Sequence, residues 1–238
     1  MIKIKKIIPT ALLLTSISSV ALADNWNVGA SASYGSIDGT AKDTQTTTAG
    51  PIVAQTRGAT SGDAEFPFAS IFVEYAKTID KDLDLIIGLD YVPFKAEIDS
   101  KSFADTNVTQ PAEPAAGTTT AGTRKAKLEL ENYATLYLQP TFKVGGGTAV
   151  YGKVGYIHGD VKITGSNTAT SSTINAKDTL NGYTVGLGVQ HNLDKNLFVR
   201  LEGNFTAHDD VTATDSLGTK FTADSELIAG KLSIGYSF

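Results

Sequence analysis

The chain contains no cysteine. Disulfides, thiol chemistry and a lipid-modified cysteine are therefore excluded. After residue 23, no segment approaches the roughly 18 consecutive apolar residues that a membrane-spanning helix needs. If the remaining chain spans a membrane, it must do so as a closed β-barrel, because only helices and closed barrels satisfy every backbone polar group inside lipid.

Positive charge is also scarce. The chain has 20 lysine and arginine residues against 25 aspartate and glutamate residues, and its formal net charge is −5. Removal of residues 1–23, which hold three of the lysines, would change this charge to −8. Binding of phosphate backbones needs a basic stripe, which the sequence lacks, so we expect no nucleic-acid partner.

Only three histidines are present, His158, His191 and His208. No sequence pattern links any of them to a serine, so we predict no catalytic residue. The acidic group Asp209, Asp210 and Asp215 could hold a divalent cation or bridge lipopolysaccharide, but it lacks the spacing of a calcium loop. A solvated loop is the favoured interpretation, and no metal site or cofactor is expected.

Residues 1–23 have the parts of a signal peptide. Three lysines precede an apolar run over 7–20, and the small residues Ala21 and Ala23 suit a signal peptidase. We predict cleavage before Asp24, which leaves 24–238 as one domain. A membrane anchor is the alternative, but the apolar run is short for spanning a bilayer.

Apolar and polar residues alternate with a period of two in the rest of the chain, which predicts β-strands with one apolar face. The alternating segments are residues 26–37, 66–79, 83–98, 127–144, 149–164, 180–193, 197–208 and 225–238. Pro93 cannot donate to a ladder, so we expect a bulge or an exit from the membrane there. In 149–164 the apolar parity changes after Tyr156, which predicts a bulge near Gly159.

Short and long connections alternate along the chain. The short ones are 80–82, 145–147 and 194–196, and the long polar ones are 38–65, 99–126, 165–179 and 209–224. We predict an all-β fold, a transmembrane antiparallel up-and-down barrel of eight strands with short periplasmic turns and long extracellular loops. The first two long loops are expected to be flexible and weakly structured.

The polar faces of these strands carry charges of both signs. The charged positions are Glu74, Asp90, Glu129, Glu131, Lys153, Arg200, Glu202 and Lys231. A soluble lipocalin-like barrel would turn its apolar side chains inward, so this pattern favours a barrel whose apolar face meets lipid. Aromatic residues near the strand ends on the apolar parity predict interfacial girdles, in preference to a ligand-stacking role.

An eight-stranded barrel is only wide enough for side chains to fill its interior, so charges inside it must pair. We predict a lumen network in which Lys153, Arg200 and Lys231 meet Glu74, Glu131 and Glu202. A permanent plug is favoured, and a gate that opens a narrow ion path by exchange of partners is the alternative.

The last eight residues, 231–238, put Leu232, Ile234, Tyr236 and Phe238 on one face of a strand. This ending resembles the C-terminal signature of bacterial outer-membrane barrels, in which a terminal phenylalanine and an aromatic residue two positions earlier are read by the assembly machinery. The resemblance marks Tyr236 and Phe238 as an assembly signal.

With the signal peptide, the four hairpins and the alternation of short and long connections, residues 24–238 resemble the family of small outer-membrane barrels that includes opacity-type adhesins, OmpX and the transmembrane domain of OmpA. The resemblance implies a monomer in the bacterial outer membrane, in contact with outer-membrane lipids and lipopolysaccharide and with the barrel-assembly machinery. It implies a structural or surface-interaction role, with a possible extracellular ligand at the loops. A narrow pore or small-molecule conduit is the alternative, and a lipid A modifying enzyme stands behind it.

Overall fold

The computed structural model describes residues 24–46, 54–56, 60–109, 118–168, 172–214, 216 and 220–238. Its strands are β1 (Asp24–Thr46), β2 (Ala54–Thr56), β3 (Thr60–Asp80), β4 (Leu83–Tyr91), β5 (Ala96–Thr109), β6 (Thr118–Gly145), β7 (Thr148–Asn167), β8 (Ser172–Asn192), β9 (Leu197–Thr214) and β10 (Lys220–Ser237). Within the described ranges, no helix is long and apolar enough to cross a membrane.

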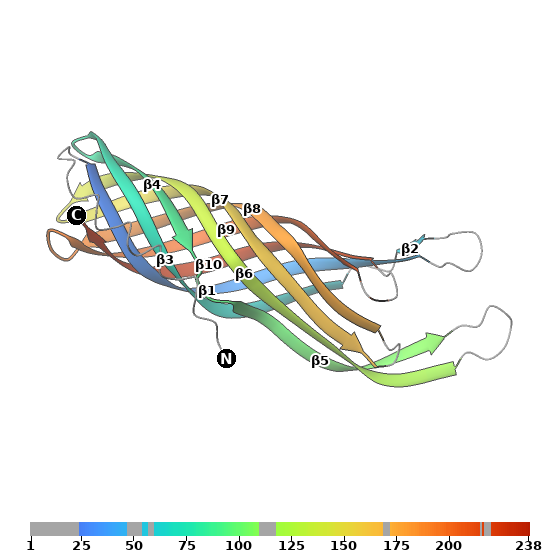
Figure 1. Ribbon diagram of the computed structural model, residues 1–238. Coiled ribbons are helices and arrows are strands. Elements are labelled where there is room, and N and C mark those ends of the chain that lie inside the picture. The colour runs from blue at the N-terminus through green and yellow to red at the C-terminus, as the bar shows by residue number, and fades with distance from the viewer. Residues whose placement is uncertain are drawn as a thin grey trace, which may run out of the picture.

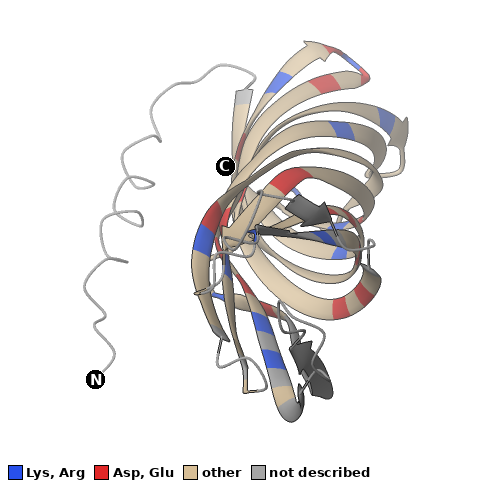
Figure 2. Cartoon of the chain, turned by 90° about the vertical axis from the view of Figure 1, so that its right-hand side faces the viewer, with Lys and Arg blue, Asp and Glu red and all other residues tan. Residues whose placement is uncertain are grey.

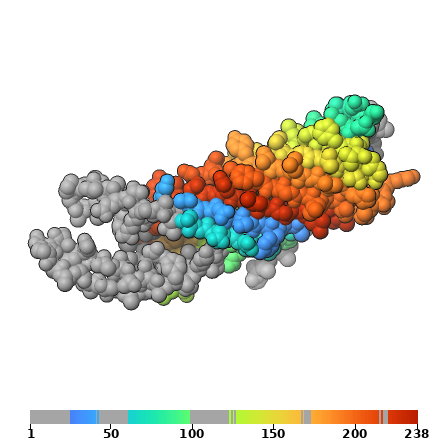
Figure 3. Space-filling view, turned by 180° about the vertical axis from the view of Figure 1, so that it is seen from behind, coloured from blue at the N-terminus to red at the C-terminus, as the bar shows by residue number. Residues whose placement is uncertain are grey.

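The strands close into a ring (Figure 1). Each strand pairs antiparallel with its neighbours, and β1 closes the ring by pairing with β10 from Asn27↔Ser237 to Thr44↔Lys220. Figure 3 shows the two ends of the described chain, blue and red, side by side on this wall. β4 and β5 both pair with β6 and are two parts of one strand, interrupted around Pro93, while β2 only extends the pairing of β1. The predicted eight-stranded antiparallel barrel is confirmed.

The short turns lie at one end of the barrel, where Phe238 also lies. The backbone amide of Trp26 donates to the carbonyl of Phe238 at 3.0 Å, and the amide of Phe238 donates back to Trp26 at 2.9 Å. The turn between β6 and β7 consists of three glycines with φ of +93°, +61° and +74°. These positive angles explain the Gly145–Gly146–Gly147 sequence, since other residues rarely adopt them.

At the other end, the strands continue far into the segments that the sequence predicted as loops. The described hairpins pair as far as Ala41↔Thr60, Thr109↔Thr118 and Asn167↔Ser172. The prediction that the first two long loops are flexible and weakly structured was therefore wrong for the described part of these segments. The two prolines of the second predicted loop, Pro111 and Pro114, lie outside the described residues, as do Asp215 and residues 1–23.

Apolar side chains face outward over one section of the barrel, which we call the belt section. It comprises residues 26–34, 67–75, 85–91, 134–142, 150–156, 183–189, 199–207 and 228–236. Leu187, for example, is 75% exposed and Ile228 is 61% exposed. Tyr34, Tyr156 and Tyr183 are exposed where the belt section meets the long hairpins, as an interfacial girdle requires.

Beyond the tyrosines lies the hairpin extension, which comprises residues 35–46, 60–66, 92–109, 118–133, 157–168, 172–182, 208–214 and 220–227. Here the two faces are reversed: charged side chains are exposed on the outer face, and a buried apolar cluster fills the interior. Figure 2 marks the charged residues along the strands. The cluster contains Phe66, Val92, Ala96, Ile98, Leu130, Tyr133, Ile157, Leu180 and Leu227, together with Ala229 at the adjoining edge of the belt section. The extension therefore has a hydrophobic core of its own.

A bulge in β6 produces part of this reversal. The pairing with β7 shifts between Glu131 and Ala134, and Asn132 adopts a φ of +52° while its side chain donates to Asp160 at 2.7 Å. One extra residue exchanges the two faces of a strand beyond the bulge. Leu130 therefore enters the core, and Glu131 faces outward. In β9, the residues Asp209 and Asp210 oppose a single residue of β10 and have the same effect on Val211 and Ala213.

The prediction of a bulge in β7 near Gly159 was wrong. β7 pairs with β8 without a register shift from Thr148↔His191 to Asn167↔Ser172. Ile157 and Val161 are buried on the same inward parity as Lys153. The apolar residues of β7 change parity because the surroundings of the strand change, and the extra residue lies in the neighbouring strand β6.

Candidate functional site

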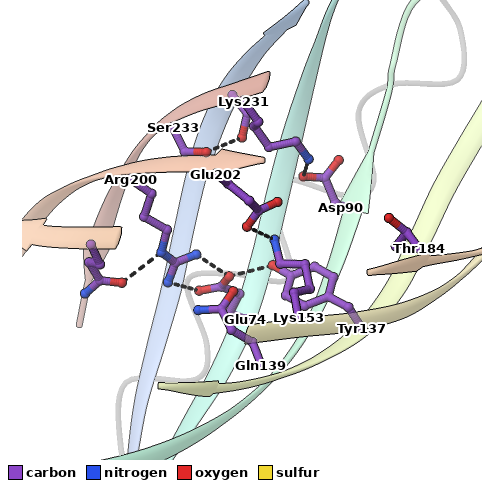
Figure 4. Close-up of polar contacts among 12 residues, drawn as sticks. Glu74, Asp90, Tyr137, Gln139, Lys153, Thr184, Arg200, Glu202, Lys231 and Ser233 are labelled. Atoms are coloured by element: carbon purple, nitrogen blue, oxygen red, sulfur yellow. Dashed lines mark hydrogen bonds and ion pairs between the residues drawn. The ribbon is translucent and has the colours of Figure 1, made fainter. Parts of the chain in front are cut away.

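The candidate site is a set of charged side chains inside the belt section, drawn in Figure 4. They occupy inward positions of five strands: Glu74 on β3, Asp90 on β4, Lys153 on β7, Arg200 and Glu202 on β9, and Lys231 on β10. The alternation within each strand points these side chains into the lumen, while their sequence neighbours face outward.

Arg200 and Glu74 form a two-pronged ion pair across the lumen. The Nη1–Oε1 and Nη2–Oε2 distances are 2.5 and 2.8 Å, and the two residues are 3% and 1% exposed. Glu74 also accepts hydrogen bonds from the Tyr137 hydroxyl at 2.5 Å and the Asn27 amide at 3.1 Å. The remaining Arg200 Nε donates to Gln190 at 2.8 Å. Such full hydrogen bonding is what a buried ion pair needs to offset its desolvation.

Two further ion pairs, Lys153–Glu202 and Lys231–Asp90, lie next to the Arg200–Glu74 pair. Lys153 Nζ is 2.5 Å from a carboxylate oxygen of Glu202 and 4.3 Å from the centre of the Tyr137 ring. Lys231 Nζ donates to Asp90 at 3.0 Å. Glu202 and Lys231 are direct partners in the β9–β10 ladder, so charges of alternating sign adjoin across the lumen.

The space around these charges is small. A cavity of about 40 Å³ lies among Asp90, Lys153, Glu202 and Lys231, and the Oε1 atom of Glu202 at its edge has no hydrogen-bond partner in the described structure. On the side of the hairpin extension, a cavity of about 10 Å³ is lined by apolar side chains and His208. In the described structure, a charged layer and an apolar layer thus follow each other along the lumen.

Five of the six residues predicted for the lumen network lie together, but Glu131 does not. The bulge at Asn132 turns Glu131 to the outer face, where it lies 2.5 Å from Lys95 and 3.9 Å from Lys177. The hydrogen bond from Lys95 lowers the pKa of the Glu131 carboxyl. Asp90 is the partner of Lys231, and the sequence placed it on the polar face without assigning it a partner.

The three histidines lie apart from one another. His208 contacts the Ser225 hydroxyl at 3.2 Å through Nδ1 and the Tyr133 hydroxyl at 3.3 Å through Nε2. No pattern in the sequence indicated this contact with a serine, because it joins β9 to β10 across the ladder. No group of three or more histidine, aspartate and glutamate side chains in the described structure is placed to hold a metal ion.

The two aromatic residues of the predicted assembly signal lie together at the end of β10. The rings of Tyr236 and Phe238 are stacked with centres 6.5 Å apart, and both are exposed on the outward face.

A closed barrel with an apolar belt outside and charges inside defines the class of β-barrel membrane proteins. The chain belongs to the family described as "Outer membrane protein beta-barrel domain", which matches residues 10–223. This confirms the resemblance that the sequence showed.

Several solved structures are similar to this chain. Ail of Yersinia pestis has 14% identity and a TM-score of 0.40, and the match covers 87% of this chain and 98% of Ail. The protease OmpT of Escherichia coli has 12% identity and a TM-score of 0.48, with 89% and 97% covered. OprG of Pseudomonas aeruginosa has 14% identity and a TM-score of 0.48, with 90% and 95% covered. No curated protein sequence matches this chain significantly.

Proposed function

We propose that this protein is a structural or surface-interaction barrel of the bacterial outer membrane, without catalytic activity and with a permanently closed lumen. The observation that carries the proposal is the succession of two closing layers, the ion pairs around Arg200 and Glu74 and the apolar cluster of the hairpin extension. A barrel that is closed twice is suited to carry the extension, which is the part available to partners outside the cell.

The proposal also includes the orientation of the barrel in the membrane and the route by which the chain reaches it. The short turns face the periplasm and the hairpin extension faces outward, as is usual for this architecture. Residues 1–23 act as a signal peptide removed before Asp24, where β1 begins. Tyr236 and Phe238 are read by the assembly machinery, and the folded barrel is a monomer.

Heat-dependent mobility on SDS gels tests the location of the protein in the outer membrane and its fold as a closed barrel. Unboiled and boiled outer-membrane fractions are compared on an SDS gel, with and without protease treatment of whole cells. A mobility shift, with cleavage only in the hairpin extension, supports the proposal. A protein recovered from the soluble periplasm, without a shift, would overturn it.

A narrow pore is the second candidate, favoured by the cavity beside the ion pairs. Conductance in planar bilayers separates the two. A closed barrel gives no steps, and the Lys231→Met variant also gives none because the apolar layer remains. Reproducible steps that change with Lys231→Met would establish the pore instead.

The contact between Ser225 and His208 is the one observation that favours catalysis on membrane lipids. Mass spectrometry of lipid A from cells with the protein, without it and with Ser225→Ala tests this candidate. We expect identical acyl chains in all three. An acyl change that requires Ser225 would contradict the non-catalytic role.

A further inference from the structure

The outer face of the hairpin extension is divided into two halves of different charge. The acidic half is formed by β9, β10, β1 and β3, which are consecutive around the ring, and the lysine half by β5, β6, β7 and β8. Figure 2 marks the charged residues along these strands.

In the acidic half, three carboxylates stand side by side. Glu226 is paired directly with Asp38, and Asp38 is paired directly with Asp63. All three side chains are exposed. Like charges directly opposite each other are unfavourable, and none of the three has an ion-pair partner within the described residues. The same half also carries Glu65, Asp209, Asp210 and Asp224, against Lys42 and Lys220.

The lysine half presents Lys95, Lys125, Lys127, Lys162 and Lys177 on its outer face. Lys162 and Lys177 are directly opposite each other in the β7–β8 ladder. Lys177 lies 2.9 Å from Asp160, whereas Lys162 has no ion-pair partner in the described part of the chain. Lys177 also lies 3.9 Å from Glu131, and Lys162 is directly opposite Glu129 in the β6–β7 ladder. The outer face of this half thus carries the carboxylates Glu97, Glu129, Glu131 and Asp160 against its five lysines, whereas the acidic half carries seven carboxylates against two lysines.

Lys95 and Lys127 are exposed side chains that pair with carboxylates at the surface. Lys127 lies 3.0 Å from Glu97 and 3.1 Å from Glu129, and its side chain is 40% exposed. Exposed pairs of this kind contribute little free energy, because water screens them. An incoming anion can therefore replace a carboxylate at small cost.

The position of the lysines relative to the belt indicates the kind of anion. Tyr156 and Tyr183 lie six residues nearer to the belt than Lys162 and Lys177 on the same two strands. They form an edge-to-face pair with ring centres 5.4 Å apart, and both are exposed. Tyrosines of this kind mark the level of lipid headgroups. The lysines stand beyond that level on the same strands, on the side of the tyrosines away from the apolar belt, where charged headgroups lie.

We propose that phosphorylated headgroups of lipopolysaccharide bind to the lysine half of the hairpin extension and avoid the acidic half. Phosphates are attracted by the lysines of the lysine half, among them the adjacent Lys162 and Lys177, and repelled by the row Glu226–Asp38–Asp63. The proposal rests on the outer-membrane location given above, and it adds a defined side of the barrel to which this lipid binds.

Photo-cross-linking tests the asymmetry within one barrel. A photoreactive amino acid replaces Thr179 in the lysine half or, as the matched control, Ser61 in the acidic half, since both are exposed outward positions. A third probe replaces Leu187 in the belt section. The proteins are reconstituted in vesicles of phospholipid and lipopolysaccharide. We expect roughly fivefold or more lipopolysaccharide adduct at position 179 than at position 61.

The three probes separate two failures. If Leu187 gives no lipid adduct, the barrel is not in the membrane and the proposed function fails with it. If Leu187 labels lipid but positions 179 and 61 give equal lipopolysaccharide adducts, only the asymmetry is overturned. Equal labelling of position 179 by phosphatidylglycerol in vesicles without lipopolysaccharide would overturn the assignment to lipopolysaccharide.

Charge variants provide the second test. The variant with Lys127→Gln, Lys162→Gln and Lys177→Gln should lose the preference for position 179, whereas Lys42→Gln with Lys220→Gln should keep it. Each variant must show the same heat-dependent mobility as the parent protein. A preference that survives the triple substitution would contradict the proposal.

Discussion

The belt section and the hairpin extension are built from the same strands, yet their two faces are exchanged. In the belt section, Leu138 faces outward and Tyr137 lies inside, whereas in the extension of the same strand Leu130 is buried inside and Glu131 faces outward. The difference follows from the surroundings: lipid accepts an apolar outer face, and water does not.

The comparison shows that alternation along a strand defines two faces but does not say which face is inside. In β7 the chain keeps its register and the residue types change, from Val154 outward to Val161 inward. In β6 a bulge moves the side chains instead. Two neighbouring strands thus pass from lipid to water by two different means.

Deletion of Asn132 should have the largest effect on this contrast. Without the extra residue, Glu131 and Glu129 would turn into the apolar core and Leu130 would turn outward, at a cost of several kcal/mol. Hydrogen exchange should then show that residues 118–131 lose protection while the belt section keeps its heat-dependent mobility. Asn132→Gly is the control, since glycine keeps the residue count and adopts positive φ. Unchanged protection after the deletion would disprove the role of the bulge.

Arg200→Met tests the charged layer of the belt section. It leaves Glu74 buried without its cation, and we expect a loss of about 3–5 kcal/mol in the free energy of unfolding. Urea titration of the folded band on SDS gels measures this loss. Lys143→Met, which breaks the exposed pair with Asp84 at 2.8 Å, should cost about 1 kcal/mol or less. Similar losses in the two variants would show that the lumen pair is not specially buried.

Leu130→Ala tests the core of the hairpin extension. Removal of a side chain that is 4% exposed should cost about 2–5 kcal/mol through lost burial and the cavity left behind. Leu136→Ala on the same strand faces lipid, which fills the space, so its cost should be smaller. Urea titration of the two variants compares them, and the reverse order would contradict the exchange of faces.

Lowering the pH should weaken the extension slightly. Burial lowers the pKa of His208 below its usual value of 6.5, so the unfolded chain takes up a proton before the folded one does. Stability is therefore constant at neutral pH and decreases as the pH falls below about 6.5 through the lowered pKa. Hydrogen exchange of β9 and β10 between pH 7 and 5 measures the change. His208→Asn should remove the dependence, and persistence of the full dependence in this variant would assign it to another group.

Much of the fold could be predicted from the sequence because alternation is a local property. The eight strands, the short turns and the polar parity that carries Arg200 and Glu74 were all visible in it. The length of the hairpins was not, because the Thr- and Ala-rich segments lack the large apolar residues that mark strands. These segments are strands because they pair with equally polar neighbours.

The candidate site was partly accessible for the same reason. Parity placed Lys153, Glu202 and Lys231 inside, but it could not assign Asp90 to Lys231, since partners across a lumen depend on the register of separate strands. The prediction placed Glu131 in the lumen because the residue types along the strand do not reveal the bulge at Asn132. This single extra residue exchanges the two faces of the strand.

The sequence by itself determined the class of fold, the eight strands and the polar face of each strand that carries the charges, because alternation with a period of two is a local property of the chain. Only the tertiary structure decided which charges pair, where the faces exchange and which half of the extension is acidic. These features depend on the stagger between strands and on single bulged residues, which bring together positions that are far apart in the chain.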